Sequence, residues 1–151
     1  MDSATDWINR ALAKAERDDY QGAHADFTKA IELKPDYAEA FAGRGFARYD
    51  LGDCRGAIVD FTKAIALEPE YTDAYYYRGL AKSFLKDYQE AIDDYTMAIG
   101  LKPNHALAYC SRGHSKHDLA DQQGAIADYT TAISLWSSPR LMDKKLSQYL
   151  M

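Results

Sequence analysis

Apolar residues at the start of the chain recur at the spacing of a helix face rather than at the strict alternation of a strand. They fall into two groups, Trp7, Ile8, Ala11 and Leu12, and then Ala23, Phe27, Ala30 and Ile31. A short polar stretch ending at Asp19 separates the groups. An aspartate at such a place accepts hydrogen bonds from the unpaired amides of a first helical turn. The pattern predicts two helices joined by a tight turn.

The same pattern returns with a constant period. Pro35, Pro69 and Pro103 are 34 residues apart, and a proline disfavours helix at the residue before it. The period divides most of the chain into four units, residues 4–37, 38–71, 72–105 and 106–137. The predicted capping aspartates recur with the units, at Asp19, Asp53, Asp87 and Asp121. We therefore expect four consecutive pairs of helices.

Equivalent positions of the four units, which we call columns, hold similar residues. Two columns are aromatic, Trp7, Phe41, Tyr75 and Tyr109, and Phe27, Phe61, Tyr95 and Tyr129. Three columns are small, Ala11, Gly45, Gly79 and Gly113, then Ala23, Ala57, Ala91 and Ala125, then Ala30, Ala64, Ala98 and Ala132. Small residues allow helices to approach closely. These columns predict a stack in which each unit packs on its neighbours.

The columns resemble the signature of the tetratricopeptide repeat (TPR) family, in which an aromatic residue, a leucine–glycine pair, a tyrosine, an alanine, a phenylalanine and a proline follow at set offsets. The resemblance covers about residues 4–137. It implies an all-α fold, a right-handed superhelical solenoid of antiparallel helix pairs in a single domain. This chain departs from the signature at its leucine and at its first-helix tyrosine, where it has basic residues.

The departures form two basic columns that accompany an acidic one. They are Arg10, Arg44, Arg78 and Arg112, then Lys14, Arg48, Lys82 and Lys116, and the acidic column is Asp26, Asp60, Asp94 and Asp128. Basic residues four positions apart share one helix face. We interpret the three columns as a ladder of ion pairs, within or between units, that stabilises the stack. The alternative is an anion-binding stripe for a phosphopeptide or RNA, which the equal number of aspartates disfavours.

Composition narrows the choice of partner. The formal net charge of −5, with both signs interspersed, disfavours electrostatic binding to nucleic acid or to an anionic membrane. The two cysteines, Cys54 and Cys110, are typical of free thiols in a reducing compartment. The first residues carry aspartates where a secretory signal carries basic residues, and no apolar stretch approaches the length of a spanning helix. We expect a soluble cytoplasmic protein whose partner is another protein.

The chain contains no pattern that predicts catalysis. A glycine-rich phosphate loop and a nucleophile motif are both missing from the sequence. One metal-like group, Cys110, His114 and His117, has spacings of four and three residues that place it on one helix face. Such triads without a fourth ligand are more often incidental. We expect neither an enzyme nor a cofactor or metal ion, and a metal-binding regulator is the least favoured alternative.

The resemblance also implies a binding site, because the first helices of TPR units line the concave wall of the superhelix. Columns that packing does not use are assigned to this groove. The predicted site residues are Ile8, Leu12, Glu39, Phe46, Tyr49, Asp73, Tyr76, Tyr77, Leu80, Phe84 and His114. Aromatic residues are favoured as binding anchors, although some of these can instead pack between neighbouring helices. With acidic edges, the groove predicts a ligand that is an extended or helical segment with apolar side chains and some positive charge.

A carboxylate clamp is not expected in this groove. Many chaperone-binding TPR proteins hold a peptide's terminal carboxylate with lysine, asparagine and arginine side chains. The corresponding places hold Ile8, Leu12, Gly43, Asp73 and Tyr77 in the frame that starts at the first unit, and Ala42, Phe46, Tyr77, Leu107 and Ser111 in the next frame. Neither frame offers the cationic set, so binding of an acidic chaperone tail is disfavoured.

The last residues leave the repeat pattern. Ser138 and Pro139 are typical of a helix start, and Met142, Leu146 and Tyr149 then form an apolar stripe. We expect residues 138–151 to form an amphipathic helix that caps the fourth unit. Alternatively, residues 139–151 dock on a second copy of the chain and make it a self-assembling structural subunit.

Overall fold

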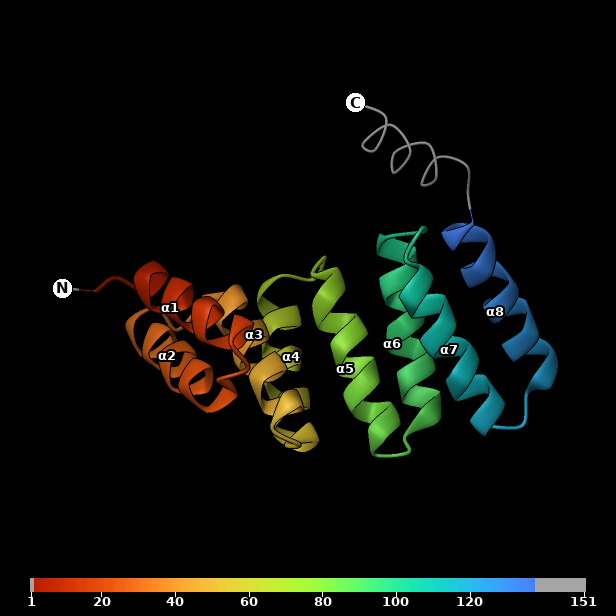
Figure 1. The fold of residues 1–151 in the computed structure, drawn as a ribbon, viewed down its shortest axis with the longest axis horizontal. Coiled ribbons are helices and arrows are strands. Elements are labelled where there is room, and N and C mark those ends of the chain that lie inside the picture. Colours follow the sequence, from red (N-terminus) through yellow and green to blue (C-terminus); the bar gives the residue numbers. More distant parts are fainter. Residues whose placement is uncertain (1, 138–151) are drawn as a thin grey trace, which may run out of the picture.

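The computed structural model describes residues 2–137, and within this range the chain forms eight α-helices and no strand. They are α1 (Ala4–Glu16), α2 (Tyr20–Leu33), α3 (Ala38–Asp50), α4 (Cys54–Leu67), α5 (Thr72–Phe84), α6 (Tyr88–Leu101), α7 (Ala106–Asp118) and α8 (Gln122–Trp136). The helices follow one another in a row from α1 to α8 (Figure 1). The predicted all-α solenoid of helix pairs is confirmed. The helix predicted over residues 138–151 lies outside the described residues.

The first helix of each pair lies on the inner side of the row. The most extensive contacts join the two helices of each pair, which are α1 with α2, α3 with α4, α5 with α6, and α7 with α8. Beyond these pairs and the direct neighbours, α1 contacts α3, α3 contacts α5, and α5 contacts α7. No comparably extensive contact joins the second helices α2, α4, α6 and α8 in the described part of the chain. The first helices therefore form the concave face, as the resemblance to the TPR family implies.

The second helices begin at the aspartates, but one of the four caps differs from the prediction. Asp19 Oδ1 accepts a hydrogen bond from the amide of Gly22 at 3.0 Å, and Asp53 and Asp121 accept equivalent bonds three residues on. Asp87 makes no such bond. In the three capped helices a glycine stands at the third position, where an added Cβ would collide with the aspartate carboxylate. Glu90 occupies that position in α6, so its Cβ leaves no room for the Asp87 side chain.

Aromatic rings of the second helices pack on glycines of the first helices. The ring of Tyr95 lies so close to Gly79 that a Cβ added there would be 2.6 Å from it. The corresponding distance from Gly45 to the Phe61 ring is 2.9 Å. Phe61 and Tyr95 are almost completely buried as a result. The glycine column therefore serves helix packing, as the sequence predicts for small residues.

The ion-pair ladder runs within units. Arg44 donates to both carboxylate oxygens of the buried Asp60, with Nε and Nη2 each 2.9 Å away. Arg48 Nη1 lies 3.0 Å from the same carboxylate. Arg78 and Lys82 bind Asp94 in the same way, and Arg112 and Lys116 bind Asp128. In these three units two paired cations satisfy the buried carboxylate, so the cations are occupied and the anion-binding alternative loses these ligands.

The ladder also joins neighbouring units through threonines. Arg78 Nη1 donates to Thr62 Oγ1 of the preceding unit at 3.2 Å. Arg112 makes the same bond to Thr96 at 3.2 Å. The first unit departs from this pattern, because Arg10 pairs with Asp2 and Lys14 alone pairs with Asp26. Arg44, Arg78 and Arg112 thus each link their own unit to the one before it.

Candidate functional site

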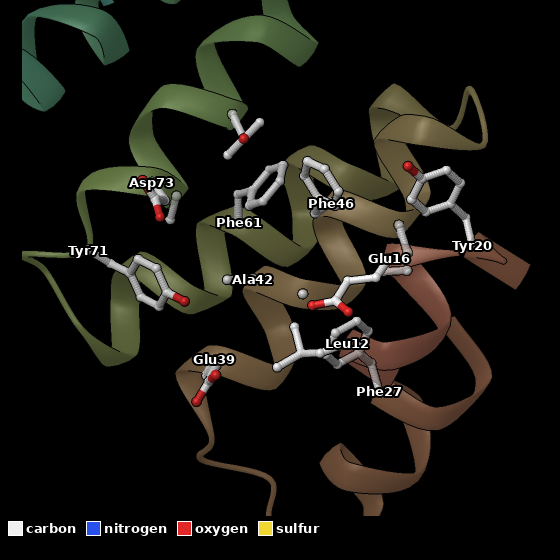
Figure 2. Close-up of a pocket in the computed structure, with 15 residues that line it drawn as sticks. Leu12, Glu16, Tyr20, Phe27, Glu39, Ala42, Phe46, Phe61, Tyr71 and Asp73 are labelled. Atoms are coloured by element: carbon white, nitrogen blue, oxygen red, sulfur yellow. The ribbon is translucent and has the colours of Figure 1, made fainter. Parts of the chain in front are cut away.

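A hollow of about 490 Å³ opens on the concave face across α1, α3 and α5 (Figure 2). Helices α2 and α4 contribute its deeper wall. It is lined by Leu12, Ala15, Glu16, Tyr20, Phe27, Glu39, Ala42, Gly43, Phe46, Ala47, Phe61, Tyr71, Asp73, Ala74 and Tyr77. A volume of this size matches the sites that bind small ligands or several side chains of a partner. We call this hollow the groove.

Aromatic rings in contact with one another form the floor of the groove. The centroid of the Phe46 ring lies 5.0 Å from that of Tyr77 and 6.3 Å from that of Tyr20, both edge to face. Tyr77 in turn stacks on Phe61, with centroids 6.2 Å apart. Rings in such arrangements hold each other in place. The floor is therefore a preformed apolar surface built from three helix pairs.

Carboxylates stand at the two edges of this floor. Figure 2 shows Glu39 and Asp73 near Tyr71 on one side, and Glu16 entering from the side of Tyr20 with its carboxylate turned toward Leu12. Glu39 and Asp73 belong to the first turns of α3 and α5, whereas Glu16 ends α1. No lysine, arginine or histidine is present among the lining residues. The groove is negatively charged at its edges and apolar between them.

The tyrosines of the groove stay protonated at neutral pH. Burial, together with the nearby carboxylates of Glu39 and Asp73, raises the pKa of Tyr71 to about 12. Burial also raises the pKa of Tyr77, with Asp73 acting in the same direction. The pKa of Asp50, beyond the groove edge on α3, is raised by burial and by Asp18. The phenols thus offer neutral hydroxyl groups beside fixed negative charges.

The predicted site residues divide into three groups. Leu12, Glu39, Phe46, Asp73 and Tyr77 line the groove together. Ile8 and Tyr76 lie in the packed interior, with 2% and 8% of their surface exposed. Tyr49, Leu80, Phe84 and His114 lie outside the lining, and of these Phe84 is 72% exposed.

Several lining residues belong to columns that the sequence assigns to packing. Phe27 and Phe61 come from the aromatic column of the second helices, and their rings form the back of the groove although only 2% and 1% of their surface is exposed. Gly43 explains the case of Phe27, because a Cβ at Gly43 would collide with the Phe27 ring. The glycine at position 43, opposite this large ring, is the sequence feature that could have indicated the position of Phe27. Tyr20, Tyr71 and Glu16 lie at helix ends, where periodicity does not define which way a side chain points.

The histidines of the metal-like group have other partners. His114 Nδ1 lies 2.7 Å from the hydroxyl of Tyr129, and His117 Nδ1 lies 2.9 Å from Gln122 Oε1. Among residues 2–137 no three His, Cys, Asp or Glu side chains stand close enough to hold a metal ion. Nor does any helix in this range combine the length and apolar character needed to cross a bilayer.

The stacked helix pairs and concave groove define an α-solenoid of the kind that presents a continuous inner surface to other molecules. Residues 11–52 match the family model described as TPR repeat, and residues 72–105 match the model described as tetratricopeptide repeat. The chain belongs to the tetratricopeptide repeat family. Comparison with curated proteins finds no match.

Solved structures with the same fold include three informative examples. The crystal structure of MamA superimposes with a TM-score of 0.86 at 24% identity, over 91% of this chain and 80% of that one. The first TPR of Spaghetti (RPAP3) bound to the HSP90 peptide SRMEEVD gives 0.77 at 27% identity, over 78% and 94%. The Arabidopsis OM64 TPR domain gives 0.76 at 25% identity, over 77% and 96%.

Proposed function

We propose that the protein is an interaction module that binds a segment of another polypeptide in the groove across α1, α3 and α5. The single observation that carries the proposal is the preformed floor of aromatic rings around Phe46 and Tyr77. Without a ligand, these rings would remain in contact with water. Burying such rings is the main source of affinity at peptide sites. The TPR of Spaghetti (RPAP3), bound to a peptide, supports this class of function. Catalysis is not part of the proposal.

The charge of the groove favours a ligand unlike the one in that complex. The HSP90 peptide has the sequence SRMEEVD, which ends in a run containing three acidic residues. Glu16, Glu39 and Asp73 would repel such a peptide, and no cation in the lining would bind its carboxylates. We therefore propose apolar anchors accompanied by positive charge, and recognition without a carboxylate clamp.

The proposal is tested by selecting peptides from a random library on the wild-type protein and measuring their affinity for Phe46→Ala. Loss of this anchor should weaken binding by about 1–3 kcal/mol. Because Phe46 also contacts the core, melting is recorded in parallel, and Leu12→Ala provides a second variant at a more exposed lining position. Phe84→Ala, which removes an exposed ring outside the groove, is the matched control. Equal affinities for all four proteins would refute the groove as the site.

Self-association is the second candidate function. Helix α8, at the end of the described chain, exposes the apolar side chains of Ile126, Ile133 and Trp136. Residues 139–151, through which we propose the copies would associate, lie outside the described residues. Light scattering over a range of concentrations tests this candidate, since a mass that rises with concentration in the full chain but not after truncation at Ser137 would support it.

A further inference from the structure

The groove lining provides many hydrogen-bond acceptors and few donors. Its polar side chains are three carboxylates, which only accept when ionised, and three tyrosines. The hydroxyl of Tyr20 already donates to Asp18 Oδ1 at 3.2 Å. Lysine, arginine, asparagine, glutamine, serine and threonine are not represented in the lining. Beyond their first turns, the lining helices use their backbone amides within those helices. Few donors are therefore available to a ligand's carbonyl groups.

This imbalance distinguishes between two backbone conformations of the ligand. An extended segment presents one carbonyl per residue, and each one buried without a donor costs free energy. A helix satisfies its carbonyls internally and contacts a surface through side chains alone. Sites that bind an extended segment as an added strand offer main-chain donors along it, whereas grooves that bind an amphipathic helix are hydrophobic. The lining around Phe46 and Tyr77 is of the second kind.

The positions of the carboxylates add a charge pattern to the ligand. On α3, Glu39 in the first turn and Asp50 at the end are eleven residues apart, which corresponds to about 16 Å along the helix axis. Glu16 and Asp50 occupy one column, and Glu39 and Asp73 occupy another. Among the lining residues, the aromatic floor lies between Glu16 on one side and Glu39 and Asp73 on the other (Figure 2). A helix of roughly 10–12 Å diameter fits between them with room for long side chains on both flanks.

From these observations we propose that the ligand is a cationic amphipathic helix that lies across α1, α3 and α5. Its apolar face covers the rings of Phe46 and Tyr77, and lysine or arginine side chains on both flanks reach the two acidic columns. The flexible stems of such side chains span the remaining distance. This inference rests on the proposed function, because it describes the ligand of the same groove.

The test uses three synthetic peptides of about 14 residues, a length that spans roughly 21 Å as a helix. The first places leucines at helical spacing, lysines on both flanks and alanines at the remaining positions. The second replaces two central alanines by prolines, which prevents the helix but keeps the charge and the leucines. The third replaces the lysines by glutamates. Fluorescence anisotropy gives the dissociation constants with the full chain, and circular dichroism follows helix formation on binding.

We expect the first peptide to bind at least about tenfold more tightly than the other two and to gain helicity. Glu39→Lys and Glu16→Lys should each weaken it severalfold and reduce the salt dependence of binding. Glu90→Lys, also in a first helical turn, and Glu32→Lys, also in a last turn, are matched controls on the second helices and should leave binding unchanged.

Two results would overturn the inference. If the proline peptide binds as tightly as the helical one and Phe46→Ala weakens both, the ligand is extended and only the proposed function stands. If neither cationic peptide binds, the helix is excluded, and the library selection with Phe46→Ala then decides the proposed function separately.

Discussion

The concave face is open across α3 and α5 but filled between α5 and α7, although the same helix pair repeats in both places. The difference lies mainly in one column. In the open part this column holds Ala42, which lines the groove. In the filled part it holds Tyr76, whose ring lies 5.9 Å from that of Tyr95 and 4.8 Å from that of His105. A repeat thus acquires or loses an open hollow through one side chain.

Charge distinguishes the same two regions. Glu39 and Asp73 face the open part from the first turns of α3 and α5. The next member of that column is Leu107, which is exposed. In the column of Phe46, α7 has His114, whose ring nitrogen contacts the hydroxyl of Tyr129. The C-terminal region therefore lacks both the aromatic floor and the acidic edge, and ligand specificity should reside in the first three units.

The largest effect is expected for Tyr76→Ala. Removing a buried ring leaves a cavity and should lower the free energy of unfolding by about 3 kcal/mol. It should also open a second hollow between α5 and α7. Chemical denaturation measures the stability, and Tyr76→Phe is the control, because it loses only the contact of 3.3 Å with Ser111 Oγ and about 1 kcal/mol. A loss below about 1 kcal/mol for the alanine variant would mean that Tyr76 does not fill this space.

A smaller effect of opposite sign is expected for Ser115→Ala. Ser115 is fully buried on α7, and its hydroxyl has no hydrogen-bond partner in the described part of the chain. The equivalent residues of α3 and α5 are Ala47 and Ala81. Removing an unsatisfied buried hydroxyl should stabilise the fold by about 1 kcal/mol. Ser111→Ala, the same substitution one turn earlier, should instead destabilise it because it deprives Tyr76 of its partner. Thermal melting of both variants gives the sign.

Much of the fold was predictable because four similar units test each interpretation four times. Proline spacing and the small columns predict the helix pairs, and the pairing of Arg44, Arg78 and Arg112 with aspartates follows the charge columns. The exceptions arise where a unit differs locally. Glu90 in place of glycine abolishes the Asp87 cap, and the first unit has only Lys14 for Asp26.

The groove was less predictable than the fold. Periodicity assigns a residue to a helix face. On a face near the boundary between core and surface, however, the side chain can be either buried by a neighbouring helix or left open to the groove. Ile8 and Tyr76, which the sequence predicts to line the groove, are therefore buried in the core. Phe27 and Phe61, which the sequence predicts to pack in the core, form the back of the groove. Which of these rings is covered depends on the size of the residue opposite, such as Gly43, in a neighbouring helix. That pairing across helices is not visible in a single repeat.

The smallest effect concerns pH, and it again separates the two regions. His105 caps α7 by accepting a hydrogen bond from the amide of Ala108 at 3.2 Å, and it contacts Tyr76. The open part has Tyr71 at the same column, whose hydroxyl does not titrate near neutral pH. Burial, and then Lys102, lower the pKa of His105, while Asp73 opposes them weakly.

Because the pKa of His105 is lowered in the folded state, the unfolded chain binds the proton more readily. The stability that the neutral ring of His105 contributes is therefore fully present above pH 6.5, the ordinary pKa of histidine. This contribution falls as the pH drops from there through the folded-state pKa. His24, whose pKa is lowered by burial and by Arg48, contributes with the same sign. Denaturation of wild type, His105→Tyr and His24→Gln between neutral and mildly acidic pH separates the two. His105→Tyr, which copies Tyr71, should flatten part of the acid slope, and an unchanged slope would show that the neutral ring of His105 contributes nothing to the filled region.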